Sequence, residues 1–431
     1  MKILVISSHY PPFHSGGYEI RIKNIMDDLS ERGHEIYVIT STKNKKGKDS
    51  DIKSNYLISR ELHEKSMKMS LIDKMTTHPI MHSIGLIMTA VREISNDIKD
   101  LQAIDQVKTR FCPDVIYLGH ILPLTRTLLP FLADCETPII LDDGGGTLYL
   151  SHQNKGIWFR FIEGDTDKFS ILNVIKPQLT KMVGLISGKS IKAHWDLPEK
   201  LQILFKRKAN LETVKNAGLP IDNAVVLHSG VDTKLFEFSR REIINSPLTI
   251  IYPARVEPRK GQMDAVKLLV KLVEKGIVTN LILVGKIRKS FFNELGKEIK
   301  DSGVENYVSI LPMVPQDELV SLFHKADICF FPSYQEEGLS RVPLEAMACG
   351  CIVISYGNEG SFEIIRDSEN GFLVDPEDFT SIIAIIKELI SKPDKVVRIT
   401  LQARKDIENQ YSLHEYVDQI EKIVINFAEA H

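Results

Sequence analysis

Short apolar runs alternate with helical patterns from the first residues of the chain. Residues 3–7 form an apolar run typical of a buried strand, and a loop rich in proline and glycine follows at residues 11–17. The next segment predicts a helix that ends at Gly33, and residues 35–40 predict a second strand. The apolar positions that give the helix its stripe are Ile20, Ile22, Ile25, Met26 and Leu29. A strand, a helix and a strand in such close succession indicate a parallel sheet with helices on its faces.

The same pattern continues to about residue 240 and then starts again. Further strands are predicted in the first stretch at residues 114–118, 138–141, 182–186 and 224–227. In the second stretch, strands at 248–252, 280–284, 308–311, 328–331 and 352–355 alternate with helices at 263–275, 316–324 and 343–348. We therefore predict an α/β fold of two doubly wound Rossmann-like lobes. Such sheets bind ligands at the carboxyl ends of their strands, so a cleft between two facing lobes is the expected site.

The composition is that of a globular protein and argues against a nucleic-acid role. A chain of 431 residues is long enough for two or three domains, and 43% hydrophobic with 26% charged residues is a typical globular balance. The 54 Lys and Arg against 57 Asp and Glu leave a net charge of −3, so no basic field is available to hold nucleic acid.

The 5 cysteines are odd in number and lack framework spacing, which indicates a reducing compartment. Cys349 and Cys351 have no second Cys or His pair nearby, and we assign them to packing.

Two features of the sequence concern membranes. The apolar start of the chain ends at His9, too early for a signal peptide, and the apolar run at 80–91 is shorter than the ~20 residues of a membrane-spanning helix. We therefore expect a cytoplasmic protein without a membrane span. A basic loop carries Lys43, Lys45, Lys46 and Lys48. Its two interpretations are an ordinary solvated loop and peripheral contact with the anionic inner face of a membrane.

Two glycine-rich nucleotide-binding motifs are not complete in this sequence, which argues against the protein classes that depend on them. A complete Gly-x-Gly-x-x-Gly fingerprint is absent, because the pair Gly16 and Gly17 lacks the third glycine and Tyr149 stands where the run at 144–146 would need it. A Walker loop is absent as well. The pair at Gly16 and Gly17 precedes the first helix, which suits close approach of a phosphate to the helix N-terminus, and a tight turn is the alternative interpretation.

Charged residues in the second lobe suit a nucleoside diphosphate. Arg255 and Lys260 flank a turn directly after a predicted strand, so that both cations would face the cleft and bind a diphosphate. Glu337 lies at a loop-to-helix junction and Glu345 follows one to two helical turns later. A carboxylate there can accept two hydrogen bonds from vicinal hydroxyls, and Gly338 would let the backbone approach a ligand. The alternative for each is an ordinary surface or helix-capping side chain.

Six segments, in this order, resemble the retaining glycosyltransferases of family 4, which have the two-lobed GT-B fold. The first is HYPPFHSGGYEIRIKNIMDDLSERGHEIYVIT, and PDVIYLGH follows, ending in the residue that matches the family's active-site histidine. VLHSGVDTKLF resembles the segment between the lobes, and IYPARVEPRKGQ resembles the diphosphate turn. ADICFFPSYQEEGLSRVPLEAMACGC resembles the signature with two glutamates, and SENGFLVDPED the closing turn.

The resemblance implies a role for each matching position. Arg255 and Lys260 would hold the donor diphosphate and stabilise charge on the leaving nucleoside diphosphate. Glu345 would hold the ribose hydroxyls, and Glu337 would hold the transferred sugar. His120 would lie near the anomeric carbon and bind a sugar hydroxyl or the acceptor, with simple packing as the alternative. The remaining donor-binding positions are Gly16, Gly17, Gly338, Leu339 and Ser340.

The resemblance also implies how the lobes are divided. Residues 1–240 would form the acceptor-side lobe, and residues 241–411 would form the nucleotide-sugar donor-binding lobe. Residues 412–431 have apolar positions at helical spacing, and in GT-B relatives the last helix crosses back to the first lobe.

The sequence departs from the family pattern at several positions. His228 stands two residues before Gly230 in a segment where the family usually has Asn before Gly, and Pro312 stands where the family has a glycine. In the diphosphate lobe, the family often has a pair of glycines after the strand, and this chain has only Gly285 there. The sequence of this base-binding loop therefore does not determine which nucleotide base is bound. The run at 142–146, Asp-Asp-Gly-Gly-Gly, is unusual for the family, and we expect it to contact the acceptor.

Together these features predict a retaining, metal-independent glycosyltransferase of the hexosyltransferase type. It would move a sugar from a nucleotide-sugar donor to a sugar, glycan or lipid-linked acceptor in cell-surface polysaccharide or glycoconjugate biosynthesis. No cofactor and no metal ligands are expected, because Arg255 and Lys260 take the place of a divalent cation. Two alternatives stay open: a GT-B nucleotide-sugar epimerase, and a catalytically idle nucleotide-sugar-binding subunit of a partner transferase.

Overall fold

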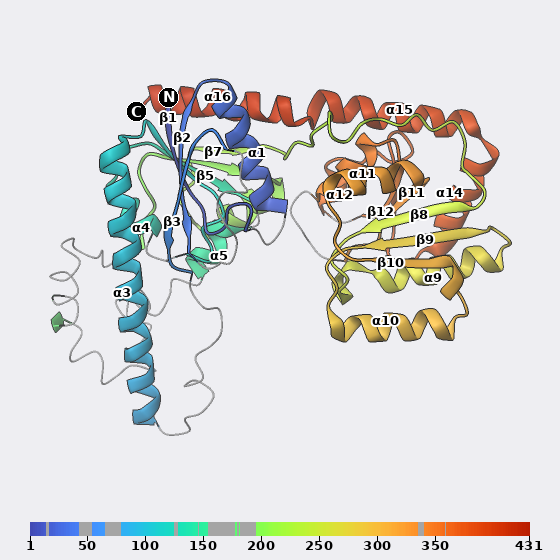
Figure 1. The fold of residues 1–431 in the computed structure, drawn as a ribbon, viewed down its shortest axis with the longest axis horizontal. Helices are drawn as coiled ribbons and strands as arrows, with labels where there is room; N and C mark the ends of the chain where they lie inside the picture. The colour runs from blue at the N-terminus through green and yellow to red at the C-terminus, as the bar shows by residue number, and fades with distance from the viewer. Residues whose placement is uncertain are drawn as a thin grey trace. The chain divides into compact units, whose positions relative to one another are not determined.

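The chain forms two compact α/β units. The computed structural model describes residues 1–13, 17–42, 54–64, 79–124, 128–144, 146–153, 177–178, 181, 195–334, 340–357 and 359–431. The first unit comprises Met1–Leu227 with Gln419–His431, and the second comprises His228–Asp418. In each unit helices surround a parallel sheet (Figure 1). The predicted class of two doubly wound Rossmann-like lobes is confirmed.

Within the described residues, the sheet of the first unit has seven strands in the order β3-β2-β1-β4-β5-β6-β7. All are parallel to their neighbours. The strands are β1 (Lys2–Ile6), β2 (Glu35–Ser41), β3 (Leu57–Leu62), β4 (Val115–Leu118), β5 (Ile139–Asp143), β6 (Leu201–Phe205) and β7 (Ala224–Val226). The helices are α1 (Gly17–Glu31), the long α3 (Pro79–Phe111), α4 (Leu128–Leu132), α5 (Thr147–Gln153) and α8 (Lys208–Asn216). The strand predicted at 182–186 lies outside the described residues.

The first sheet lies at the centre of its unit, and its inner strands β1, β4 and β5 are buried on both faces. Every residue of β4 is buried, as are the apolar residues of β1 and β5. A parallel strand covered by helices on both faces has no polar side, which is why these strands read as continuous apolar runs in the sequence. Helix α1 buries Ile22, Ile25, Met26 and Leu29, and the chain turns after it at Gly33, whose φ of +93° favours glycine.

In the second unit the described strands form a six-stranded parallel sheet in the order β10-β9-β8-β11-β12-β13. They are β8 (Leu248–Pro253), β9 (Thr279–Val284), β10 (Val308–Leu311), β11 (Ile328–Phe331), β12 (Ile352–Tyr356) and β13 (Phe372–Val374). The helices that accompany them are α9 (Gln262–Glu274), α10 (Lys289–Asp301), α11 (Gln316–Lys325), α12 (Arg341–Ala348), α13 (Glu359–Phe362), α14 (Phe379–Ser391) and α15 (Pro393–Gln410), with short 3-10 turns at Pro258–Lys260 and Glu305–Tyr307.

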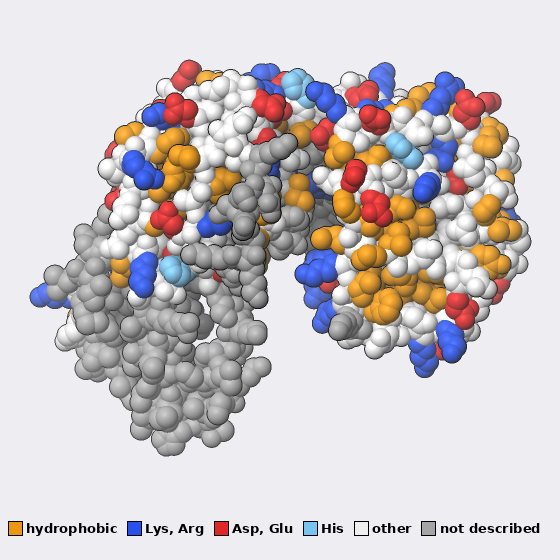
Figure 2. All heavy atoms as spheres, in the orientation of Figure 1, with side chains coloured by type: hydrophobic (Ala, Val, Ile, Leu, Met, Phe, Trp, Pro, Cys, Tyr) orange, Lys and Arg blue, Asp and Glu red, His pale blue; other side chains and the backbone are white. Residues whose placement is uncertain are grey.

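The surface and core of the second unit both carry apolar side chains. Cys349 and Cys351 are buried in the same core group as Cys329, which confirms their assignment to packing. Hydrophobic side chains also gather on the face of this unit displayed in Figure 2. The exposed large hydrophobic residues of the unit include Ile287, Phe292 and Met313.

The last helix, α16 (Leu413–Glu429), contains the boundary between the two units. The predicted buried stripe is present, since Tyr416, Val417, Ile420 and Val424 are buried. Within the first unit, Glu421 accepts a hydrogen bond from the Arg32 guanidinium at 2.7 Å, and its carboxylate lies 2.9 Å from His34 Nε2. His34 and Arg32 hold the pKa of Glu421 below its usual range.

Two predicted features bear on membrane contact: the absence of a membrane-spanning helix and a basic loop. No helix in the described part of the chain combines the length and the apolar character that crossing a bilayer requires. The basic loop with Lys43, Lys45, Lys46 and Lys48 lies outside the described residues.

Candidate functional site

Each sheet changes the direction of its strand order at one point. In the first unit the chain proceeds outward from β1 toward β3 and outward from β4 toward β7, and β1 and β4 are neighbours. In the second unit the corresponding neighbours are β8 and β11. Open α/β sheets bind ligands outside the carboxyl ends of the strands at such a switch point. The residues that follow β1, β4, β8 and β11 are therefore the candidates for function.

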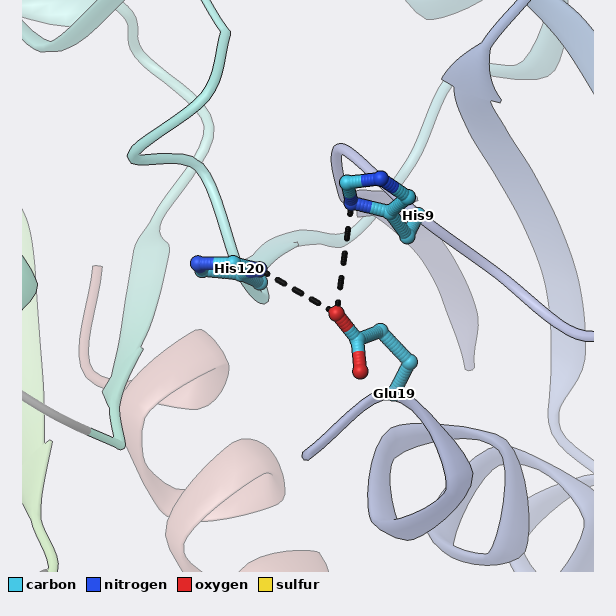
Figure 3. A group of neighbouring side chains, drawn as sticks. All are labelled: His9, Glu19 and His120. Atoms are coloured by element: carbon cyan, nitrogen blue, oxygen red, sulfur yellow. Dashed lines mark hydrogen bonds and ion pairs between the residues drawn. The ribbon is translucent and has the colours of Figure 1, made fainter. Parts of the chain in front are cut away.

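At the switch point of the first unit, two histidines converge on one buried glutamate (Figure 3). His9 follows β1, His120 follows β4, and Glu19 lies in the first turn of α1. The Glu19 side chain is 1% exposed, and its Oε1 lies 3.3 Å from His120 Nδ1 and 3.9 Å from His9 Nδ1. The two loops are joined because the Ser8 N–H donates to the His120 carbonyl at 2.8 Å. The topology thus brings three separate segments to one point.

A second buried carboxylate supports His9 from its other side. His9 Nε2 lies 3.1 Å from Glu64 Oε1, and the Ser41 hydroxyl donates to the same oxygen at 2.7 Å. The Ser8 hydroxyl lies 3.1 Å from His9 Nδ1. Both ring nitrogens of His9 therefore have polar neighbours, and the ring orientation is fixed.

The start of α1, which carries Glu19, is held by a buried ion cluster at the end of β5. The fully buried Asp142 carboxylate accepts hydrogen bonds from Arg21 at 2.7 Å and from the Tyr117 hydroxyl at 2.6 Å, and Lys206 Nζ lies 3.2 Å away. Burial alone would raise the pKa of Asp142, but the charges of Arg21 and Lys206 outweigh burial and hold this pKa below its usual range. Arg21 belongs to the same helix as Glu19, so this cluster positions the helix that presents Glu19.

The unusual run at 142–146 has structural roles in the first unit. Tyr18 donates from its hydroxyl to the Asp142 carbonyl, and a Cβ at residue 144 would lie 1.7 Å from the Tyr18 ring, so only Gly144 leaves room for that ring. Asp143 accepts from the N–H groups of Thr147 and Leu148 at 2.8 and 3.0 Å and so caps α5. Both aspartates are fully buried in protein contacts. Their protein contacts give both aspartates a structural role, and contact of the run at 142–146 with the acceptor stays a prediction. Gly145 lies outside the described residues.

At the switch point of the second unit, the turn after β8 carries Arg255 and Lys260. The two cations differ in exposure, since the Arg255 side chain is 57% exposed and pairs with Glu257 at 3.3 Å, whereas Lys260 is 5% exposed. The alternative interpretation, an ordinary exposed surface charge, therefore does not fit Lys260, although the exposure of Arg255 is compatible with it. A buried cation interacts more strongly with an opposite charge than an exposed one, because water screens it less.

The turn is fixed by hydrogen bonds to its backbone. The Tyr252 hydroxyl donates to the Lys260 carbonyl at 2.6 Å, and the Gln262 side-chain amide donates to the Arg255 carbonyl at 2.9 Å. The turn also joins the segment after β11, because the Tyr334 N–H donates to the Arg259 carbonyl at 3.1 Å. Gly261 has φ of +74°, and a Cβ there would lie 2.0 Å from the Pro332 carbonyl oxygen. The cationic turn is therefore packed against residues 332–334, which follow β11.

Glu345 lies in α12 and is buried beside a cation of the same helix. Arg341 Nη2 lies 3.0 Å from Glu345 Oε1. Burial raises the pKa of Glu345, and the Arg341 guanidinium opposes this rise. Ser340 is the residue before α12, and its side chain makes no capping hydrogen bond.

The structure separates the predicted site residues into groups. His120 lies with His9 and Glu19 in the first unit, where Gly17 is the first residue of α1. Arg255, Lys260, Ser340 and Glu345 lie at the carboxyl edge of the second sheet. The predicted residues Gly16, Glu337, Gly338 and Leu339 lie outside the described residues.

Sequence reasoning missed the partners of His120. Glu19 and Glu64 were not singled out, and His9 served only to mark the end of an apolar run. The available signal was positional, because His9 follows a predicted strand just as His120 does, and residues after strands share one edge of a parallel sheet.

Comparison with known proteins identifies the class of the second unit. Residues 234–406 match the family model described as glycosyl transferases group 1. The resemblance proposed from the sequence motifs is thereby confirmed for this part of the chain. The amylovoran biosynthesis glycosyltransferase AmsK of Erwinia amylovora is 26% identical over 220 residues, which are 49% of this chain and 53% of that protein. The chain spans about half the length of the curated relatives it matches.

Solved structures show that the fold extends over the whole chain. A glycosyltransferase from Rickettsia africae aligns over 99% of this chain and 98% of its own, with a TM-score of 0.68 and 17% identity. Anabaena Alr3699/HepE, crystallised in complex with UDP-glucose, aligns over 99% of this chain and 100% of its own, with a TM-score of 0.65 and 17% identity. The chain therefore has the GT-B fold.

Proposed function

We propose that this protein is a retaining glycosyltransferase that moves a sugar from a nucleotide-sugar donor to an acceptor hydroxyl. One observation carries the proposal: a buried lysine, an exposed arginine and a buried glutamate lie at the switch point of the second sheet. These are Lys260, Arg255 and Glu345, and all three fall within residues 234–406, which match the family model.

The cationic turn would stabilise the leaving group. When the bond between the sugar and the nucleotide breaks, negative charge grows on the departing diphosphate. Lys260 and Arg255 are charged groups on a turn already fixed by Tyr252 and Gln262, so little reorganisation is needed as the charge develops. The side-chain cations replace a divalent metal in this proposal, and the transfer needs no cofactor.

Glu345 would hold the ribose of the donor. An ionised carboxylate accepts hydrogen bonds from two vicinal hydroxyls, and burial makes those bonds stronger than in water. Burial raises the pKa of this carboxylate, and the Arg341 guanidinium opposes the rise and so favours the charged form. Glu337, Gly338, Leu339 and Ser340 would hold the transferred sugar, as the resemblance implies.

The first unit would supply the acceptor side of the reaction. His120 is held by Glu19, so its ring is oriented before a substrate binds. The resemblance assigns this histidine to a sugar hydroxyl or to the acceptor, and it assigns Gly16 and Gly17 to the donor phosphates or the acceptor. Attack by the acceptor hydroxyl on the face from which the diphosphate leaves would retain the anomeric configuration.

The relatives suggest where to look for substrates. Because HepE was crystallised with UDP-glucose and AmsK is named for amylovoran biosynthesis, we propose a UDP-sugar donor and an acceptor from polysaccharide or glycoconjugate assembly. Such an acceptor is a sugar, a glycan or a lipid-linked glycan. The protein would act in the cytoplasm, with peripheral contact at the inner face of the membrane when the acceptor is lipid-linked.

A donor screen tests the proposal. UDP-, GDP- and ADP-sugars are incubated with the protein, with and without glycan acceptors, and the released nucleoside diphosphate and the anomeric configuration of the product are measured. We expect one donor class to be consumed faster with acceptor than without, and the product to keep the donor's configuration. A sugar epimer formed without acceptor would indicate an epimerase, and binding without turnover would indicate an idle subunit. The matched variants are Lys260→Ala and, on the exposed end of α9, Lys275→Ala.

A further inference from the structure

The convergence of His9, Glu19 and His120 has the donor set of a zinc site. Two imidazoles and one carboxylate, with a position left for water, bind Zn²⁺ in many proteins. The three ligand atoms lie within 4.8 Å of one another. Tetrahedral ligands at zinc distances are about 3.3 Å apart. Glu19 Oε1 and His120 Nδ1 are already at 3.3 Å, and His9 Nδ1, at 3.9 Å from Glu19, needs only a small movement.

The contacts of His9 leave its Nδ1 able to bind a metal ion beside Glu19. In a neutral imidazole one nitrogen donates and the other presents a lone pair. When His9 Nε2 donates to Glu64, its Nδ1 turns a lone pair toward Glu19 and the Ser8 hydroxyl. The Ser8 hydroxyl can donate to this lone pair, and a metal ion placed between His9 Nδ1 and Glu19 Oε1 would be bound by the lone pair and would pair with the buried carboxylate.

The surroundings of His9 match those of a metal-bound histidine. A histidine that binds a metal almost always donates its other N–H to a carboxylate, which orients the ring. Glu64 occupies that position beside His9 Nε2 and is itself held by the Ser41 hydroxyl. The His120 side chain is 27% exposed, so an ion can enter from the side of the histidines. Figure 3 shows both rings directed at the Glu19 carboxylate.

We propose that His9, Glu19 and His120 bind one Zn²⁺ ion, and that this ion inhibits the enzyme. The binding site follows from the described geometry alone. The inhibitory effect rests on the proposed function, because the ion occupies Nδ1 of the histidine assigned to the acceptor side and removes the Glu19 contact that orients it.

Binding is tested without any activity measurement. The full chain carrying Cys112→Ser, which removes an exposed thiol, is freed of metal and titrated with Zn²⁺ against a chromophoric chelator. Co²⁺ serves as a second probe, because its visible absorption reports tetrahedral nitrogen and oxygen ligands. We expect one equivalent to bind with a Kd in the micromolar range or below. The absence of saturable binding at one equivalent would overturn the proposal.

Variants locate the ion. Glu19→Gln keeps the shape of the side chain but removes the anionic ligand, and it should weaken Zn²⁺ binding at least tenfold, as should His120→Gln. His414→Gln, at an exposed histidine of α16, is the matched control and should bind like the parent protein. Equal affinity of Glu19→Gln and the parent would contradict the assignment.

Glu64, whose carboxylate orients His9, provides an independent test if a variant of a ligand residue does not fold. Glu64→Gln leaves all three ligands in place and removes only the carboxylate that orients His9. We expect it to weaken Zn²⁺ binding by about 10–100-fold. Unchanged affinity in this variant, checked for folding by circular dichroism, would also contradict the site.

The inhibitory effect is tested last and separately. In the transfer assay, Zn²⁺ should reduce turnover at concentrations that match its Kd, and Glu64→Gln should shift inhibition to higher Zn²⁺. Activation by Zn²⁺ would overturn the inhibitory role. A protein that binds Zn²⁺ but transfers no sugar with any donor would count against the proposed function and leave the binding site standing.

Discussion

The two switch points share a topology but differ in their chemistry. At β1 and β4 of the first unit, histidines meet a buried carboxylate, and the nearby Asp142 is neutralised by cations of the protein itself. At β8 and β11 of the second unit, Lys260 and Arg255 stand on a turn fixed through its backbone, and Glu257 pairs with the exposed one. The first arrangement can bind a proton or a metal ion, and the second can bind a negatively charged ligand.

The comparison shows that the same edge of the same fold can be specialised by a few side chains. Parallel sheets place strand ends side by side regardless of which residues follow them. The residues after the strands then decide whether the edge binds an anion or presents imidazoles. Experiments that alter one edge and leave the other intact therefore test the division of roles directly.

The largest effect is expected from Asp142→Asn in the first unit. The substitution leaves Arg21 and Lys206 buried without their carboxylate, and breaking such a buried pair costs about 3–5 kcal/mol. Scanning calorimetry of the full chain should show a lower unfolding temperature. Asp327→Asn is the counterpart in the second unit and should cost less, because Asp327 faces one guanidinium, that of Arg241, and otherwise neutral amides. An Asp142→Asn protein as stable as the parent would contradict this reading of the cluster.

The next largest effect is expected from Lys260→Ala in the second unit. Removing a preorganised group that stabilises transition-state charge costs about 2.7–4 kcal/mol, a reduction of about 10²–10³-fold in turnover. Donor KM should change much less than kcat, because the charge grows only as the diphosphate leaves. Arg255→Ala should have a smaller effect, since its side chain is exposed and shared with Glu257. Steady-state kinetics with the donor found in the screen measures both variants, and equal losses would remove the distinction between the two cations.

A smaller effect is expected from Arg341→Met on the pH dependence of nucleotide binding. Burial raises the pKa of Glu345 and Arg341 lowers it, so the variant should have a still higher pKa. The carboxylate then gains its proton at higher pH, and a protonated Glu345 accepts fewer hydrogen bonds from the ribose. Calorimetric titration with the released nucleoside diphosphate should show affinity falling with decreasing pH, and in the variant this fall should begin at a higher pH. Identical pH profiles would show that Arg341 does not control this carboxylate.

The smallest effect is expected from chelators. Because side-chain cations are proposed to neutralise the diphosphate, treatment with EDTA should leave the transfer rate unchanged or raise it slightly by removing Zn²⁺. Initial rates before and after treatment and dialysis provide the measurement. A loss of activity that only Mg²⁺ or Mn²⁺ restores would place a metal in the donor site and weaken the contrast between the two edges.

The sheets could be predicted from the sequence because their central strands are apolar on both faces. β1, β4, β8 and β11 were all found in this way. β3 was missed because its sequence, LISREL, places charged residues within the strand, and a partly exposed edge strand lacks the apolar run on which the prediction depends. β6 and β13 were also missed, although both are largely apolar and β7, as short as β13, was predicted.

The two candidate sites differed in how far the sequence could predict them. Arg255, Lys260 and Glu345 belong to two short motifs whose residues are contiguous in the sequence, so the motifs can be recognised without the structure. Glu19 and Glu64 reach His120 and His9 only through the order of the strands, which no local pattern contains. The burial of Lys260 was also beyond the sequence, because it depends on how the turn packs against the segment after β11.

The boundary inside α16 has a consequence for biosynthesis. The chain enters the second unit at residue 228 and returns to the first at residue 419, so the unit that emerges first from the ribosome is completed last. At translation rates of about 5–20 residues per second, the first unit waits roughly 10–40 s for the segment that carries Glu421. During that time Arg32 and His34 lack the contacts with the Glu421 carboxylate that they make in the complete fold. A released chain that ends at residue 418 should therefore contain a complete second unit and an incomplete first one.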